Sequence, residues 1–485
     1  MSESPATTVS TPQRGSLLAG ACLLYLLLPN VLFLAGWVQP WLAWPLIVLL
    51  SFGCFHLWRR LGDVRPVHRG GRRWQLPAVL LAGFLAVYMM GFNGDFPQAG
   101  DFLVRNAIYD SLIREDWPLH SARGEYFVYY HAFWLPPAFV AKFAGGVVAP
   151  WLVLALWVYV GIVLFVLSLY RRAGRRLPGL LLLLLGVACM QEVLGRADVI
   201  ARYLPVQGAV DAYYSVVPVP MRYPAVWVQL VNTFNHCIPV LLLLGCGFGR
   251  VFRGTSLLLA SALVVACSPL GAAALLVYLG FLQLPHLRHN PLKVLLPLVK
   301  SPLLYVDLVL LFLLGLYFGS GGGTGCVPAW RGDTFVGHPQ DLAIAYILGT
   351  LFTLLPLAFA WRFRHTSAFR TAVLVTVLFP LVWVGVDLNE LQLKGILIVF
   401  FFVPVLLYAA WPYARRGKRC AMVPMLVAAA YIPFLDIQHR LREYGTSAQQ
   451  HERNIQGEWQ GHLNHPEHYW YSRFWGKEAP LFYKK

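Results

Sequence analysis

The sequence predicts an all-α polytopic membrane protein with about 13 transmembrane helices, each needing roughly 20 apolar residues to cross a bilayer. Hydrophobic residues make up 58% of the 485 residues and charged residues only 13%, and the mean hydropathy is +0.59. Soluble globular domains are less apolar, and about 25% of their residues are charged. The composition therefore excludes a soluble globular protein.

The basic residues give the chain a net charge of +17, but their distribution argues against nucleic-acid binding. They occur as short clusters between apolar runs and do not form one polar domain. This arrangement is typical of the cytoplasmic loops of membrane proteins. We therefore expect the lipid bilayer, and no nucleic acid, among the partners of the chain.

The predicted spans follow from apolar runs, the shorter of which must tilt or thin the bilayer around them. The two shortest runs are separated by Ser268 and Pro269, which predict a turn. In chain order the runs are 16–36, 41–57, 76–92, 148–169, 178–194, 224–247, 255–267, 270–283, 294–318, 341–360, 371–386, 395–412 and 420–435.

The basic clusters also predict the orientation. With the tail 1–15 in the cytoplasm, every cluster falls on the cytoplasmic side. The clusters comprise Arg59, Arg60, Arg65, Arg69, Arg72 and Arg73, four arginines in 171–176, Arg250, Arg253, Arg288 and Lys293, and Arg362, Arg364, Arg370, Arg415, Arg416, Lys418 and Arg419. The outer side then receives 93–147, 195–223, 319–340, 387–394 and the C-terminal segment 436–485.

The first outer loop, 93–147, interrupts the apolar first half of the chain and concentrates its acidic residues. Six of the 22 acidic residues lie in it: Asp95, Asp101, Asp110, Glu115, Asp116 and Glu125. We expect helices on the outer membrane surface at 101–115 and 126–143, because counting 126–143 as a span would place the arginines of 171–176 outside. The acidic residues of this loop predict a functional site, and a solvated loop without such a site is the alternative.

The C-terminal segment 436–485 differs from the transmembrane domain, 16–435, because it mixes charged residues with aromatic ones. A disordered tail would contain few aromatic residues. We expect this segment to fold back over the outer face as a cap. An aromatic segment resting on lipid headgroups is the alternative.

Asp101 and Arg105 are the first candidate site residues. They are four apart, so they share one helix face, where the cation can keep the carboxylate ionised. Asp101 follows a glycine, and it can equally be the cap of a helix N-terminus. Both roles are compatible, since a cap that faces a cleft still supplies a carboxylate.

The next candidates lie in and before the run 224–247. Arg202 and Arg222 are suited to phosphate, because a guanidinium donates two hydrogen bonds and stays charged. Gln229, Asn235 and His236 are polar groups inside an apolar run, where they need partners. For the arginines the alternative is ordinary loop charge, and for the other three it is hydrogen bonding between helices.

The last candidates, Asn389, Glu390 and Lys394, belong to the outer turn before the run 395–412. Glu390 and Lys394 are four apart and predict an ion pair, which can also supply a phosphate anchor and a second carboxylate. Lys394 alone is equally explained by reaching toward the membrane surface. Lys300 and Asp307 are the charged residues of the run 294–318, and they can pair within the membrane.

The chain lacks the sequence motifs of several enzyme classes. Its eight cysteines show no metal-binding spacing, and neither a phosphate-binding glycine loop, a His-Glu-x-x-His helix nor a serine nucleophile elbow occurs. We therefore predict no cofactor and no metal site, although a divalent metal is not excluded.

Several short motifs, in order along most of the chain, resemble those of the GT-C class of integral membrane glycosyltransferases, in particular a bacterial subgroup. Gly100 to Ile108 resemble the subgroup's G-D-W-x-K-H-N-A-I pattern, and Tyr129 to Ala138 resemble its Y-Y-x-x-Y-Y-L-P-A pattern. Asn235-His236 with Pro239 resemble its Q-H-x-x-P positions, and Ser268-Pro269 resemble its S-P pair. Asn389-Glu390 with Lys394 resemble its N-D-F-x-M-R positions. Departures from the pattern include Phe102 for Trp, Arg105 for Lys, Glu390 for Asp and Lys394 for Arg. The Asp-x-Asp pair of metal-using members is missing.

The resemblance implies a multi-pass protein of the bacterial inner membrane that transfers a sugar at the outer face. The donor would be linked to a polyprenyl phosphate, and the acceptor would be a glycan, lipid or protein of the cell envelope. Asp101 would accept the proton of the acceptor, while Arg202, Arg222 or Lys394 would neutralise the departing phosphate.

Two other functions fit parts of the sequence. A lipid-linked glycan polymerase or ligase would share the GT-C fold. A transporter or flippase would show ionisable residues near the middle of its spans and an inverted repeat. Asp307 and Lys300 are nearly alone there, whereas acidic outer loops are abundant, which favours the transferase.

Overall fold

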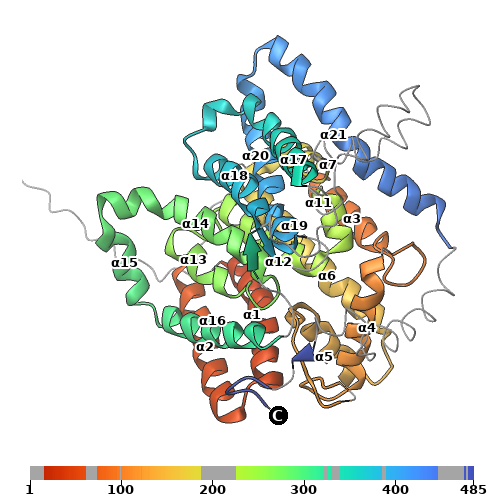
Figure 1. Cartoon of the computed structure of the whole chain (residues 1–485), viewed down its shortest axis with the longest axis vertical. Helices are drawn as coiled ribbons and strands as arrows, with labels where there is room; N and C mark the ends of the chain where they lie inside the picture. The colour runs from red at the N-terminus through yellow and green to blue at the C-terminus, as the bar shows by residue number, and fades with distance from the viewer. Residues whose placement is uncertain are drawn as a thin grey trace, which may run out of the picture.

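The computed structural model (Figure 1) is almost entirely helical. Most of its helices are apolar enough to lie in a membrane, so the structure confirms an all-α membrane protein, although not the count of thirteen spans. The described residues are 16–61, 74–98, 100–121, 123–186, 225–321, 326–328, 339–384, 389–445, 475–476 and 479–484.

Within these residues, six helical segments are long and apolar enough to cross a bilayer. Several of them begin with proline, whose fixed φ and missing N–H suit the first helical position. Two of these, α2 (Pro40–Arg60) and α6 (Pro150–Ala173), end with basic residues such as Arg59 and Arg171, which complement the negative end of the helix dipole. The six are α1 (Leu17–Trp37), α2 (Pro40–Arg60), α6 with α7 (Pro150–Ala173 and Leu177–Gly186), α14 (Pro269–His289), α16 (Pro302–Gly319), and α19 with α20 and η6 (Glu390–Gly395, Leu397–Ala410 and Trp411–Tyr413).

The remaining elements are shorter or less uniformly apolar. The helices are α3 (Gln75–Tyr88), α4 (Gly100–Arg114), η1 (Ala132–Trp134), α5 (Leu135–Phe143), η2 (Gly174–Arg176), α11 (Val226–Asn232), α12 (Phe234–Phe248), α13 (Thr255–Ala262), α15 (Pro291–Val299), α17 (Pro339–Phe359), η4 (Trp361–Phe363), α18 (Ser367–Leu378), η5 (Phe379–Leu381) and α21 (Arg416–Arg442). Two antiparallel strand pairs join β1 (Tyr126–Phe127) to β4 (Trp475–Gly476) and β2 (Cys326–Pro328) to β3 (Val382–Val384).

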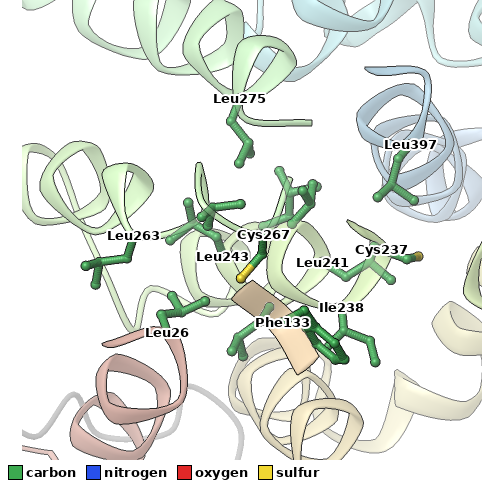
Figure 2. Packing of buried hydrophobic residues seen from close by; sticks show 14 of the residues in the cluster. Leu26, Phe133, Cys237, Ile238, Leu241, Leu243, Leu263, Cys267, Leu275 and Leu397 are labelled. Atoms are coloured by element: carbon green, nitrogen blue, oxygen red, sulfur yellow. The ribbon is translucent and has the colours of Figure 1, made fainter. Parts of the chain in front are cut away.

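Helix α12 lies in the middle of the molecule beside α6 (Figure 1) and is buried along nearly its whole length. After its first turn it is apolar on all sides, as expected of a helix surrounded by other helices. Figure 2 shows part of this core, and Ile238 and Leu241 of α12 belong to the same cluster of buried residues as Leu26 of α1, Leu397 of α20 and Phe133 of the first outer loop. The first outer loop is therefore packed into the central core.

Hydrogen bonds join several neighbouring helix ends that carry or adjoin basic residues. Ser16 at the start of α1 donates its backbone N–H to Leu61, just after α2. Arg172 at the end of α6 donates to the carbonyl of Phe248 at the end of α12, 3.3 Å away. Gln75 at the start of α3 donates to the carbonyl of Arg175 at 3.4 Å. These bonds join neighbouring helix ends, and the single basic side remains a prediction.

The C-terminal residues lie at the opposite helix ends. Trp475 and Gly476 pair with Phe127 and Tyr126. The Tyr483 hydroxyl donates to the carbonyl of Leu313 in α16 at 2.7 Å, and the backbone N–H of Lys484 donates to Trp37 at the end of α1 at 2.8 Å. The last residues of the chain are thus fastened to the first outer loop and to two long helices.

Three predicted elements differ from the structure. The segment 126–143 is not one helix, because residues 126–127 form a strand and α5 begins only at Leu135, before two prolines. The run 294–318 is broken into α15 and α16 by residues 300–301 ahead of Pro302. The run 255–267 contains only the eight-residue α13, which is too short to span a bilayer.

The boundary predicted at residue 436 also differs. Helix α21 continues without interruption from Arg416 to Arg442, because the polar residues after 435 keep helical spacing and face partners on the outer loop. A truncation after residue 436 would therefore cut through a helix.

We expect the basic face to be cytoplasmic, and two cysteine substitutions at exposed arginines test this. Arg123→Cys, in the first outer loop, should react with a membrane-impermeant maleimide in intact cells. Arg175→Cys, on the basic face, should react only after permeabilisation. Both substitutions are made in a protein in which Cys326 and Cys420 are replaced by serine, so that these native thiols do not react with the maleimide. The reverse labelling pattern would invert the predicted orientation.

Candidate functional site

Helix α4 carries Asp101 and Arg105. Asp101 is the second residue of the helix, and its side chain lies outside the part of the chain that the structure describes. Arg105 is only 5% exposed, and its guanidinium carbon lies 5.9 Å from the centroid of the Phe102 ring. Burying a cation is costly unless polar or anionic groups surround it. Arg105 therefore indicates a polar region inside the protein.

Asn235 and His236 lie where α11 gives way to α12. The helix breaks at Thr233, whose backbone is not helical (φ −136°, ψ 42°). The Thr233 hydroxyl donates to the carbonyl of Gln229 at 2.9 Å and so does not cap α12. Gln229, Asn235 and His236 are all buried. The break places Asn235 and His236 in the first turn of α12, within the core.

His236 is the residue on which the other segments converge. Its Nδ1 lies 3.3 Å from Oγ of Ser268, the residue that precedes α14. The ring of Tyr130 meets the His236 ring edge-on, with 4.3 Å between centroids. Arg105 and Lys394 lie near enough to act electrostatically on His236. We name Arg105, Tyr130, His236, Ser268, Glu390 and Lys394 the polar cluster.

Helix α19 supplies Glu390, the acidic residue of the polar cluster. Asn389 precedes the helix, accepts from the N–H of Gln392 at 3.2 Å and donates to the carbonyl of Val382 at 2.9 Å. Nζ of Lys394 lies 3.4 Å from Oε2 of Glu390, and the two side chains are 4% and 23% exposed. The predicted ion pair is therefore present, and it is largely buried.

Tyr130 connects the ion pair to His236. Burial raises the pKa of the Tyr130 hydroxyl well above its usual value, and the nearby Glu390 carboxylate raises this pKa further, while Arg105 lowers it. The net result is a phenol that stays protonated at neutral pH. Tyr130 can therefore donate a hydrogen bond to a bound ligand but does not supply a base.

His131, the next residue, has a separate environment. Its Nδ1 lies 2.8 Å from the carbonyl oxygen of Tyr129, and its ring lies 4.3 Å from that of Trp37. Burial lowers the pKa of His131 to about 3, even though the Tyr129 carbonyl acts to raise it. His131 is therefore neutral at physiological pH and packs within an aromatic core.

The structure brings together some of the residues chosen from the sequence. Arg105, His236, Glu390 and Lys394 belong to the polar cluster, and Asn389 and Asn235 adjoin it in the chain. Gln229 lies on α11, before the break. The predicted phosphate ligands Arg202 and Arg222 fall outside the described residues.

Two members of the cluster, Tyr130 and Ser268, were not among the candidate site residues. Both belong to the short motifs that resemble those of the GT-C subgroup. The signals that could have found them are a tyrosine pair before two prolines and a Ser-Pro break between two apolar runs.

Two other predictions concern charged groups and metals. Lys300 is exposed between α15 and α16, whereas Asp307 is buried in α16, and no ion pair joins them. Across the described ranges, no three His, Cys, Asp or Glu side chains gather as a metal-binding group.

No protein-family model, no curated protein and no solved structure matches the chain. The chemistry of the polar cluster and the motif resemblance are therefore the basis for a functional proposal.

Proposed function

We propose that this protein is a glycosyltransferase that moves a sugar from a polyprenyl-phosphate-linked donor to a cell-envelope acceptor at the outer face of the bacterial inner membrane. The supporting observation is the polar cluster, in which α4, the loop before η1, α12, Ser268 and α19 converge on His236. Buried ionisable groups inside an apolar protein are expensive and so favour a functional role.

The proposed reaction needs few groups. Asp101, one helical turn before Arg105, accepts the proton of the acceptor hydroxyl as the sugar carbon passes through an oxocarbenium-like state. Arg105 and Lys394 stabilise the negative charge on the departing phosphate. The lipid tail lies between apolar helices, which is why the site adjoins the membrane. No cofactor takes part in this scheme.

A transporter or flippase is the second candidate, and the interrupted helices favour it. The breaks at Thr233 and before Pro269 lie near the polar cluster, and discontinuous helices form the binding sites of many transporters. A polymerase or ligase would use the same cluster with a longer donor glycan.

The test is transfer by the purified full chain in detergent. Polyprenyl-phosphate-linked radiolabelled sugars are supplied with membrane extracts of a deletion strain as acceptors. We expect label in an envelope glycan, lipid or protein, and loss of the same product from the deletion strain by mass spectrometry. Movement of intact lipid-linked sugar across liposomes without transfer would favour the flippase and contradict the proposal.

A further inference from the structure

Two short connections between helices meet at the end of α20 that is remote from the polar cluster. Helix α20 is 14 residues long, so it extends about 20 Å from α19 before the chain enters η6. The other connection contains η4 and joins α17 to α18, both of which pack against α20. The guanidinium carbon of Arg362 in η4 lies 3.6 Å from the centroid of the Tyr413 ring in η6. We name residues 361–364 and 411–419 the Arg362–Tyr413 surface.

The ionisable side chains of this surface, other than the Tyr413 phenol, are all basic. In the part of the chain that the structure describes, no ion pair joins them to a carboxylate. Four of them precede or occupy the first turn of α21, where the helix dipole is positive and like charges repel one another. Their position therefore costs free energy unless an anion lies close by. The exposed cations are Arg362, Arg364, Arg415, Arg416, Lys418 and Arg419.

Exposed aromatic rings lie among these cations. Trp361, Trp411 and Tyr413 are 59%, 38% and 65% exposed. The guanidinium carbon of Arg364 lies 5.7 Å from the centroid of the Trp361 ring. That of Arg419 lies 5.9 Å from the centroid of the Trp411 ring. Trp and Tyr are enriched where the hydrocarbon of a membrane meets its headgroups, so the mixture favours an amphiphile with an anionic head over a free anion.

Helix α17 supplies an apolar stripe that leads to this surface. Ile347, Leu351 and Leu355 are four apart, so they share one helix face, and all three are exposed. The helix ends at Phe359, just before η4. An acyl chain can therefore lie along α17 while the headgroup that it carries reaches the cations.

We propose that the Arg362–Tyr413 surface binds the headgroup of an anionic phospholipid. The contact of Arg362 with the Tyr413 ring uses none of the five N–H donors of the guanidinium, so these can bind phosphate oxygens. Basic sites between transmembrane helices bind anionic headgroups through the same charge complementarity. Because α20 separates the surface from the polar cluster, this lipid site is independent of the proposed sugar transfer.

A fluorophore on Cys420 tests the proposal with the full chain in detergent. Cys420 is exposed next to Arg419, the other described cysteines are buried, and serine replaces Cys189 and Cys326. Brominated phosphatidylglycerol and brominated phosphatidylcholine with the same acyl chains are the quenchers. We expect half-maximal quenching at a mole fraction of phosphatidylglycerol at least about 10-fold lower, because each nearby cation strengthens binding of anionic lipid about fivefold. Equal values for the two lipids would overturn the proposal.

Substitutions locate the lipid. Arg362→Gln and Lys418→Gln should each raise the half-maximal mole fraction of phosphatidylglycerol about fivefold and leave that of phosphatidylcholine unchanged. Lys293→Gln is the matched control for Lys418→Gln, because it removes one exposed charge from α15 and lowers the net charge equally. Unchanged phosphatidylglycerol binding in both surface variants, or equal weakening by Lys293→Gln, would overturn the proposal.

Two additions distinguish a lipid site from a site for a free anion. Unbrominated phosphatidylglycerol should relieve the quenching in proportion to its amount, whereas an equal concentration of inorganic phosphate should leave it unchanged. Displacement of the brominated lipid by that phosphate would overturn the lipid assignment. Raising the salt concentration to about 1 M should weaken the phosphatidylglycerol binding, because exposed charges are screened. Binding that does not depend on salt would contradict recognition through the cations.

Discussion

Asp101→Asn is expected to lower the rate of sugar transfer by about 10²- to 10⁴-fold, the usual contribution of a positioned general base. Asparagine keeps the size of the side chain and an oxygen that can cap the start of α4, but it cannot accept the proton. Expression and thermal stability should therefore match the wild type. The measurement is the initial rate of transfer by purified protein, with melting temperature determined in the same detergent.

Asp110→Asn and Asp116→Asn are the matched controls for Asp101. Asp110 pairs with Arg114 at 2.9 Å on the exposed side of α4, and Asp116 lies 3.6 Å from Lys142 at the surface. Exposed pairs of this kind contribute at most about 1 kcal/mol, so both controls should transfer sugar normally. If Asp101→Asn instead loses stability but transfers at the wild-type rate, Asp101 is a helix cap, and Glu390 becomes the next carboxylate to replace.

Arg440→Met should destabilise the protein by about 3–5 kcal/mol, because it leaves a partly buried carboxylate without its cation. Arg440 is 4% exposed, and its Nε donates to Oδ2 of Asp436 at 2.9 Å. Its Nη1 donates to the carbonyl of Pro97 at 2.7 Å and to that of Met89 at 3.3 Å. The same Asp436 oxygen accepts from Nε1 of Trp227 at 2.8 Å. Arg440 thus ties α21 to the segment that leads into α4, and it holds Asp436, which binds Trp227 of α11.

Arg442→Met is the control for this prediction, because Arg442 is exposed two residues further along the same helix. We expect it to change the free energy of unfolding by less than about 0.5 kcal/mol, as is usual for surface substitutions. Stability is measured by denaturant titration in mixed micelles. Equal stability of the two variants would show that the bonds of Arg440 to the first outer loop contribute nothing to the fold.

The contrast between α4 and the segment after it shows where sequence reasoning succeeded. The helix predicted at 101–115 occurs at Gly100–Arg114, because its start near a glycine and its length are local properties. The helix predicted at 126–143 does not occur over its first half. Residues 126–127 pair with Trp475 and Gly476, which lie more than three hundred positions away in the chain, and no local pattern signals that partner.

The interrupted runs show a different limit. Hydropathy averaged over a window cannot separate α15 from α16, because the two polar residues before Pro302 are outweighed by the apolar residues on either side. The same averaging hides the break at Thr233, where one non-helical residue separates α11 from α12. The position of such a break is set by tertiary packing, because the helices on its two sides pack against different neighbours.

The sequence by itself determined that this chain is an α-helical membrane protein, because apolar content and run length decide whether a segment prefers lipid to water. It also picked out Arg105, Glu390 and Lys394, as members of charge pairs four apart in the outer loops, and His236, as a polar group inside an apolar run. Only the tertiary structure decided that these four meet, with Tyr130 and Ser268 among them. The physical reason is that their contacts join segments far apart in the chain, and the packing of whole helices around α12 sets those distances.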